Sequence, residues 1–86
     1  MLMLAEGTIH RPVVDDQLAA VRAWFGPMVD SGFLQSGHVD LAGERLWLLV
    51  SGASLADASQ RLNDLPVVQD GAVTFTMVAV NAVRFR

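Results

Sequence analysis

Four segments of the chain carry the patterns of apolar residues that are typical of β-strands, namely residues 2–10, 33–39, 45–51 and 72–85. In the first segment, the side chains alternate between a small apolar face and a face that becomes polar toward its end. In the third segment, every residue from 46 to 50 is apolar, which indicates a central strand that is covered on both faces.

Two further segments have the spacing of helices. The first helix is predicted over residues 14–29, where apolar side chains that include Phe25 recur at helical spacing and should face the core. Pro27 interrupts this pattern, and we expect a kink or a short second piece there. The second helix, residues 54–62, opens on Ser54, which is a good N-cap residue.

The predicted order of elements is therefore β-α-β-β-α-β, in a single domain of residues 1–86. Two right-handed β-α-β crossovers place both helices on one face of a four-stranded antiparallel sheet. This is the ferredoxin-like α+β arrangement, with the strands in the spatial order 4-1-3-2.

Composition indicates that a second copy covers part of the apolar surface. Hydrophobic residues make up 52% of the 86 residues and charged residues 17%, against about 45–50% and about 25% in typical domains. Two short helices cover only one face of the sheet, yet Leu48 and Val50 are expected on one face and Trp47 and Leu49 on the other. We expect a homodimer through the helix-free sheet face. The alternatives are a strand-four tail that folds back and a larger assembly.

The charges and the missing residue types exclude several kinds of chemistry. The net charge is −3, and all six basic residues are scattered arginines, so no basic face for nucleic acid is expected. Lys, Cys and Tyr are absent, which excludes a disulfide, a cysteine-ligated metal and a lysine Schiff base. We expect no targeting segment, no membrane span and a cytoplasmic location. The residue usage is typical of high-GC bacterial genomes.

One group of candidate functional residues lies on the polar side of the first strand. Glu6, Thr8 and His10 share a face there and can line a cavity between two facing sheets. We expect Glu6 to be buried among apolar side chains that include Met77, and to act as a catalytic acid or base. Thr8 and His10 are assigned to substrate binding. The alternative is that Glu6 pairs with an arginine and that His10 is solvated.

A second group lies on the predicted hairpin of strands two and three. His38 is a candidate proton carrier, Arg45 can hold a carboxylate or an enolate oxygen, and Trp47 can stack on a flat substrate. The alternative for His38 is a hydrogen bond to Asp40. His10 and His38 lack the spacing of metal ligands, so we expect no metal and no organic cofactor.

Several short motifs resemble those of the dimeric α/β-barrel superfamily, within which the chain is similar to muconolactone-isomerase-like and YCII-related proteins. They are the stretch from Ser31-Gly32 through the strand over residues 45–50, the helix start over residues 54–58 and Leu65-Pro66-Val67. The chain departs from these proteins in two places, since it has no His near the first helix and no Trp-Arg pair in the second strand.

This resemblance implies a small cofactor-free enzyme that transfers a proton on a small carbonyl or lactone compound, as an isomerase, lyase or cyclase. In these terms, Glu6, His38 and Arg45 are the catalytic candidates. Two alternatives remain open: a cofactor-free monooxygenase of the same superfamily, and a non-catalytic module for ligand binding or assembly.

Overall fold

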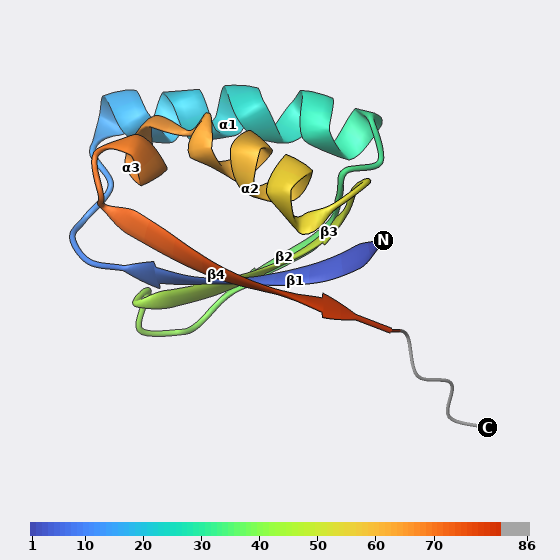
Figure 1. The fold of residues 1–86 in the computed structure, drawn as a ribbon. Coiled ribbons are helices and arrows are strands. Elements are labelled where there is room, and N and C mark those ends of the chain that lie inside the picture. Colours follow the sequence, from blue (N-terminus) through green and yellow to red (C-terminus); the bar gives the residue numbers. More distant parts are fainter. Residues whose placement is uncertain (82–86) are drawn as a thin grey trace.

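The computed structural model describes residues 1–81 of the chain. Its elements are β1 (Leu2–Ile9), α1 (Asp15–Asp30), β2 (Leu34–Val39), β3 (Arg45–Ser51), α2 (Leu55–Asn63), α3 (Pro66–Gln69) and β4 (Val73–Val80). The four strands form one antiparallel sheet in the order β2-β3-β1-β4, and the helices lie on one face of it (Figure 1). This confirms the predicted ferredoxin-like α+β fold and its strand order. Among the described residues, no helix is both long and apolar enough to cross a bilayer.

Three elements differ from the prediction. α1 runs as one helix through Pro27, so no separate second piece forms, although the missing N–H of Pro27 leaves the carbonyl of Ala23 without its usual intrahelical bond. α3 was not predicted; it begins at Pro66, a residue type that is favoured at the first position of a helix. β4 ends at Val80, and the last residues of the longer strand that was predicted lie outside the described part of the chain.

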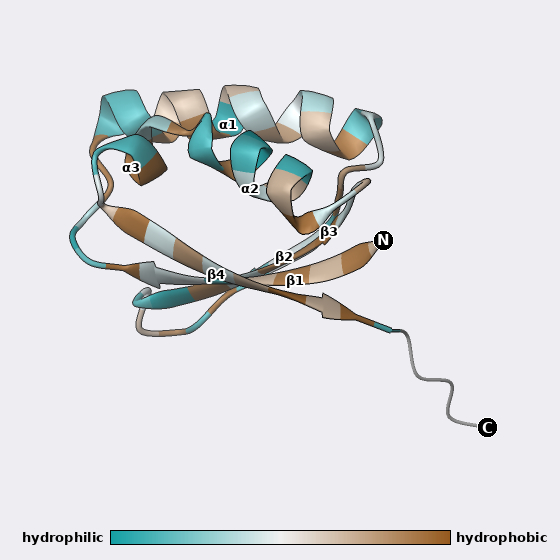
Figure 2. Ribbon diagram, in the orientation of Figure 1, coloured by the Kyte–Doolittle hydropathy of each residue, from teal (hydrophilic) through white to brown (hydrophobic). Residues whose placement is uncertain are grey.

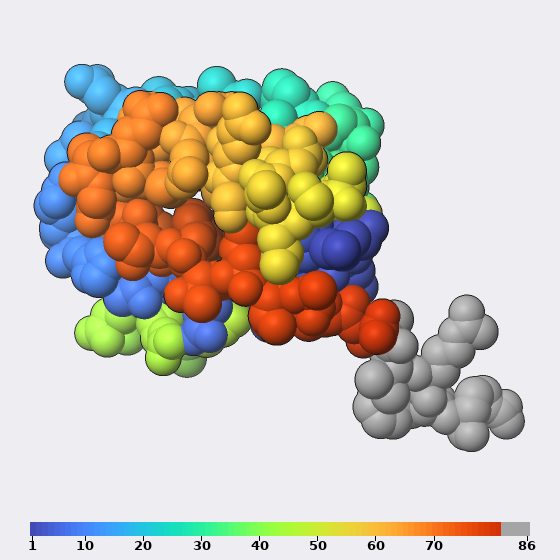
Figure 3. Space-filling view, viewed as in Figure 1, coloured from blue at the N-terminus to red at the C-terminus, as the bar shows by residue number. Residues whose placement is uncertain are grey.

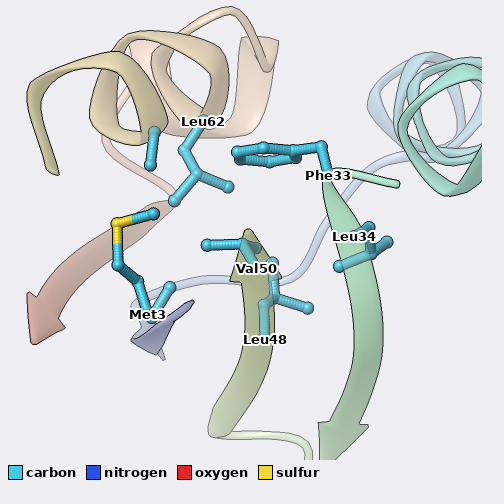
Figure 4. Close-up of a cluster of buried hydrophobic side chains, with 8 residues drawn as sticks. Met3, Phe33, Leu34, Leu48, Val50 and Leu62 are labelled. Atoms are coloured by element: carbon cyan, nitrogen blue, oxygen red, sulfur yellow. The ribbon is translucent and has the colours of Figure 1, made fainter. Parts of the chain in front are cut away.

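The hydrophobic core lies between the sheet and the helices. Met3 from β1, Val50 from β3 and Leu62 from α2 are its largest fully buried side chains. Figure 4 shows Leu62 above Val50 and Met3, with Phe33 beside it. Hydrophobic residues run along the strands, whereas hydrophilic residues occupy much of α2 (Figure 2). Because no polar or charged residue is buried among the described residues, this core is held by apolar packing alone.

A β-bulge in β2 changes which side chains share a face. Leu34 pairs with Val50, but Ser36 pairs with Leu49, so Gln35 is an extra residue between them. Without the extra residue, regular alternation would place Leu34 and His38 on the same face of the sheet. The bulge instead turns Leu34 toward the helices, where it joins the core.

The helix-free face of the sheet is apolar at one end and polar at the other. At the apolar end, Leu4 lies between Leu49 on β3 and Val78 on β4, and Leu2 pairs with Val80. The polar end carries the candidate functional residues.

Candidate functional site

Four side chains form a row across the polar end of the helix-free face. Strand register places His38 on β2 opposite Trp47 on β3, Trp47 opposite Glu6 on β1, and Glu6 opposite Thr76 on β4. Because residues directly opposite each other share a face, one row contains an imidazole, an indole and a carboxylate. The strand register thus places His38, Trp47 and Glu6 side by side on this face.

A second row lies next to it, closer to the tip of the β2–β3 hairpin. Here Arg45 lies opposite Thr8, and Thr8 lies opposite Thr74. His10 follows the end of β1, and its Nε2 is 2.8 Å from Oγ1 of Thr74. All six candidate residues are therefore on, or at the end of, the same face of the sheet.

Glu6 and Arg45 connect the two rows through an ion pair between the guanidinium and the carboxylate. The Glu6 side chain is 41% exposed and that of Arg45 is 51% exposed. In a single copy of the chain, Glu6 is therefore paired with an arginine and half-exposed, which was the alternative to its burial.

We expected Met77 to pack beside Glu6, but the two side chains lie on opposite faces of the sheet. Met77 is opposite Ala5 in the register, on the helix side of β4. There it packs against the core, and its sulfur accepts a hydrogen bond of 3.4 Å from Oγ of Ser59. On β4, the apolar residue nearest to Glu6 on the helix-free face is Val78, which lies opposite Leu4 in the next row.

An open cleft of about 820 Å³ lies between the end of β1 and the tip of the β2–β3 hairpin. Residues 8–12 form one wall and residues 43–45 form the other, so Thr8, His10 and Arg45 all line it. In Figure 3 the hairpin tip, in green, lies beside the blue residues of β1 and the segment after it. Glu6 is not one of the lining residues, but it pairs with Arg45, which is.

The hairpin wall is held by an aspartate in its own loop. Oδ1 of Asp40 accepts hydrogen bonds from the backbone N–H groups of Glu44, at 2.8 Å, and Arg45, at 3.2 Å. Gly43 supplies the positive φ of 71° that closes the loop. The bond from the Glu44 N–H is the main reason that the pKa of Asp40 lies below its usual value. Asp40 thus positions Arg45 and is occupied with the backbone.

The opposite wall is held by Asp70, in the turn before β4. Its carboxylate pairs with Arg11 at 3.0 Å, accepts a bond from the side-chain amide of Gln17, and accepts one of 2.9 Å from the backbone N–H of Ala72. The Ala72 bond is the largest cause of a lowered pKa at Asp70. Sequence reasoning missed both anchors. An aspartate that precedes a glycine by one to three residues in a loop was the available signal.

A second depression, an apolar groove of about 640 Å³, lies between α1 and β2 on the helix side of the sheet. Leu18, Phe25 and Val29 from α1 line it, and His38 is the only one of the six candidates beside it. None of the 16 residues of α1 is fully buried, and Phe25 is 38% exposed. The expectation that Phe25 belongs to the core was therefore wrong.

The groove stays open because α1 is held on its other side. Nε1 of Trp24 donates to the backbone oxygen of Arg61 at 3.3 Å, and the Trp24 ring meets Phe33 edge-on at 6.1 Å. Gln17 adds its bond to Asp70. The bonds to Arg61 and Asp70 tie α1 to α2 and α3, and the contact with Phe33 ties it to the residue before β2. The flank of α1 that carries Leu18, Phe25 and Val29 faces the groove.

No three His, Asp or Glu side chains gather closely enough to hold a metal ion within residues 1–81. No protein-family model matches this chain, and no curated protein matches it. The resemblance to dimeric α/β-barrel proteins therefore stays an expectation.

Proposed function

We propose that this chain is a small, cofactor-free enzyme that transfers a proton on a small carbonyl or lactone compound. The observation that carries this proposal is the cleft at the end of β1. It gathers hydrogen-bonding side chains from Thr8 and His10 with the guanidinium of Arg45, and Arg45 in turn holds the carboxylate of Glu6.

The residues divide the work of such a reaction between them. In its ion pair Glu6 is ionised, which is the form that can take a proton from the carbon next to a carbonyl. The electron pair left on that carbon moves onto the carbonyl oxygen, and Arg45 stabilises the resulting enolate. A guanidinium has five N–H donors, so Arg45 can bind Glu6 and this oxygen together. Where a carbon–carbon double bond adjoins that carbon, the electron pair is shared with the far end of the double bond. Glu6 can return the proton there, so the double bond moves and no oxidant or reductant is needed.

The remaining candidates bind the substrate in this proposal. Thr8 and His10 offer hydrogen bonds from the wall of the cleft, and Trp47, beside Glu6 in the register, offers a flat surface for stacking. His38, beside Trp47, is the second candidate for moving a proton.

We further propose that a second copy covers the helix-free face of the sheet. Leu4, Leu49 and Val78 form an apolar row there that a facing sheet would bury. The same contact would shield the half-exposed ion pair of Glu6 and Arg45 from water, which strengthens electrostatic interactions.

The test uses exchange of hydrogen for deuterium at the carbon next to the carbonyl, in a five-membered unsaturated lactone and in a cyclic ketone. NMR follows the loss of the proton signal. Glu6→Gln keeps the shape and removes the base, so exchange should slow by ~10²–10⁴-fold. Asp16→Asn, a matched change on α1 away from the cleft, should leave the rate unchanged. Equal rates for Glu6→Gln and the unaltered protein would remove Glu6 from the mechanism.

The apolar groove between α1 and β2 favours a second candidate function, a cofactor-free monooxygenase. Its lining from Leu18, Phe25 and Leu48 suits a flat apolar compound. Dioxygen would be the oxidant and the substrate itself would supply the electrons. Oxygen consumption in the presence of an aromatic phenol distinguishes the two candidates, because proton transfer alone consumes none.

A further inference from the structure

The exposed apolar side chains of this molecule gather at the edge of the sheet formed by β2. Four large hydrophobic residues that line the groove between α1 and β2 are exposed, namely Leu18, Phe25, Val29 and Val39. Val39 is 61% exposed, and Leu41, just beyond β2, is fully exposed. On the helix-free face, Val78 is the one large hydrophobic residue of the described strands with comparable exposure. The groove beside the β2 edge therefore gathers several exposed apolar side chains in one place.

Within residues 1–81, no strand pairs with the outer edge of β2. β2 is an outer strand of the sheet, and the N–H of Asp40 donates to the carbonyl of Arg45 at 3.0 Å. Because hydrogen-bonded and non-hydrogen-bonded pairs alternate along antiparallel strands, the N–H and C=O groups of Gly37 and Val39 point away from β3. No proline or charged residue occurs in Leu34–Val39, although such residues commonly protect an exposed edge.

We propose that a second copy of this chain pairs with the β2 edge across a two-fold axis. With the axis beside His38 and perpendicular to the sheet, the free backbone groups of Gly37 would bond those of Val39 in the second copy, and the reverse. The two sheets would join into one of eight strands. Such an axis keeps the helices of both copies on the same face, so the two α1 helices would lie on either side of the seam.

A second copy fits this surface better than an unrelated ligand for two reasons. Free N–H and C=O groups of a strand edge are satisfied by another strand, and an isologous pairing satisfies both copies equally. Among the described residues that line the groove, none is an Asp, Glu, Lys or Arg, so the apolar flank of one α1 can meet the same flank of the other without opposing like charges from them. One strand edge alone is small compared with the ~800 Å² that each partner buries in a stable interface, and the exposed side chains of Leu18, Phe25 and Val29 would add apolar area to it.

This contact is separate from the one proposed across the helix-free face, and the two can occur together in an assembly of four copies. Val39→Pro tests it directly. Proline removes an N–H that points away from β3, so the sheet of each copy keeps its own hydrogen bonds. The control is Ala79→Pro on β4, the other edge, where the alternation also directs the N–H outward, because the His10 N–H bonds the Ala72 carbonyl.

The mass in solution is measured by light scattering at micromolar concentration. We expect Val39→Pro to halve the mass of the unaltered protein and Ala79→Pro to leave it unchanged. A single-chain mass for the unaltered protein, or an unchanged mass for Val39→Pro, would overturn the proposal. If the mass responds to Leu4→Lys and not to Val39→Pro, the helix-free face is the interface instead.

Amide hydrogen exchange gives a second measurement that needs no variant, and it decides the matter if Val39→Pro fails to fold. In a single copy the amides of Gly37 and Val39 face solvent and exchange rapidly. Pairing across the β2 edge should protect both of them by at least tenfold as the protein concentration is raised. Rapid exchange of both amides in the assembled protein would refute the pairing, even if a dimer forms through the other face.

Discussion

Gly7 lies where β1 passes closest to its neighbours, and replacing it with alanine should destabilise the fold. An added Cβ would lie 2.8 Å from Cε1 of Phe75 and 3.0 Å from Cγ of Leu46. Carbon atoms pack best at about 3.5–4.0 Å, so both contacts are too short by about half an ångström or more. The Phe75 ring edge and the branched carbon of Leu46 cannot move aside as the end of a flexible chain can.

The expected cost follows from two opposing effects. Overpacking a core position typically costs about 1–3 kcal/mol, and the lower chain entropy of unfolded alanine offsets about 0.4–1 kcal/mol of it. We expect Gly7→Ala to lower the free energy of unfolding by about 1–2 kcal/mol, measured by urea denaturation at a fixed protein concentration. Since Gly7 lies between Glu6 and Thr8, displacement of the strand should also weaken substrate binding in the cleft.

Gly37→Ala is the matched control. Its added Cβ would lie 3.0 Å from Cδ2 of Leu48 and 4.0 Å from the backbone oxygen of Trp47. Only the first contact is short, and that methyl group is the end of a side chain that also borders the open groove. We expect this variant to stay within about 0.5 kcal/mol of the unaltered protein. If Gly7→Ala is as stable as Gly37→Ala, the sheet accommodates the extra carbon and the close approach at Gly7 does not constrain β1.

Two further predictions concern capping and pH. Ser54 Oγ accepts the N–H of Asp57 at 3.1 Å at the start of α2, so Ser54→Ala should lower the thermal midpoint by an amount equivalent to ~1 kcal/mol, and an unchanged midpoint would mean that the cap is dispensable. The pKa of Asp70 is lowered from 3.8 mainly by the Ala72 N–H bond, so the unfolded state binds its proton first as the pH falls, and stability declines below about pH 3.8 through the folded-state pKa. Asp70→Asn should flatten this part of a urea-midpoint profile measured from neutral pH to pH 2, and a variant that keeps the full slope would show that other carboxylates cause it.

Most of the fold could be predicted because it depends on local patterns. The apolar run over residues 46–50 identified β3 as an inner strand, and Ser54 identified the start of α2. The exposure of Phe25 could not be predicted in this way. Helical spacing shows which side chains share one face of a helix, but not how much of that face the rest of the protein buries. Coverage depends on where α1 is held, and Trp24 holds it toward α2.

The candidate site was only partly accessible from the sequence. Alternation along β1 correctly placed Glu6 and Thr8 on one face. The pairing of Glu6 with Arg45 depends on the register of two strands that are separated by 35 residues and two other elements, and no local pattern determines that register. The bulge at Gln35 could not be predicted either, because it is defined by the pairing of β2 with β3 and not by the sequence of β2 alone.

The two walls of the cleft are stabilised by hydrogen bonds to carboxylates, whereas the core is stabilised by apolar packing. Asp40 fixes the hairpin wall and Asp70 fixes the wall that contains Arg11, each through a carboxylate that accepts backbone N–H groups. The core has no such dependence, because its described side chains are all apolar. The two walls therefore depend on carboxylates whose pKa lies below the usual value, so they keep their anchors until the pH falls below the range in which ordinary aspartates are protonated. The described core side chains behind them have no such carboxylate to lose.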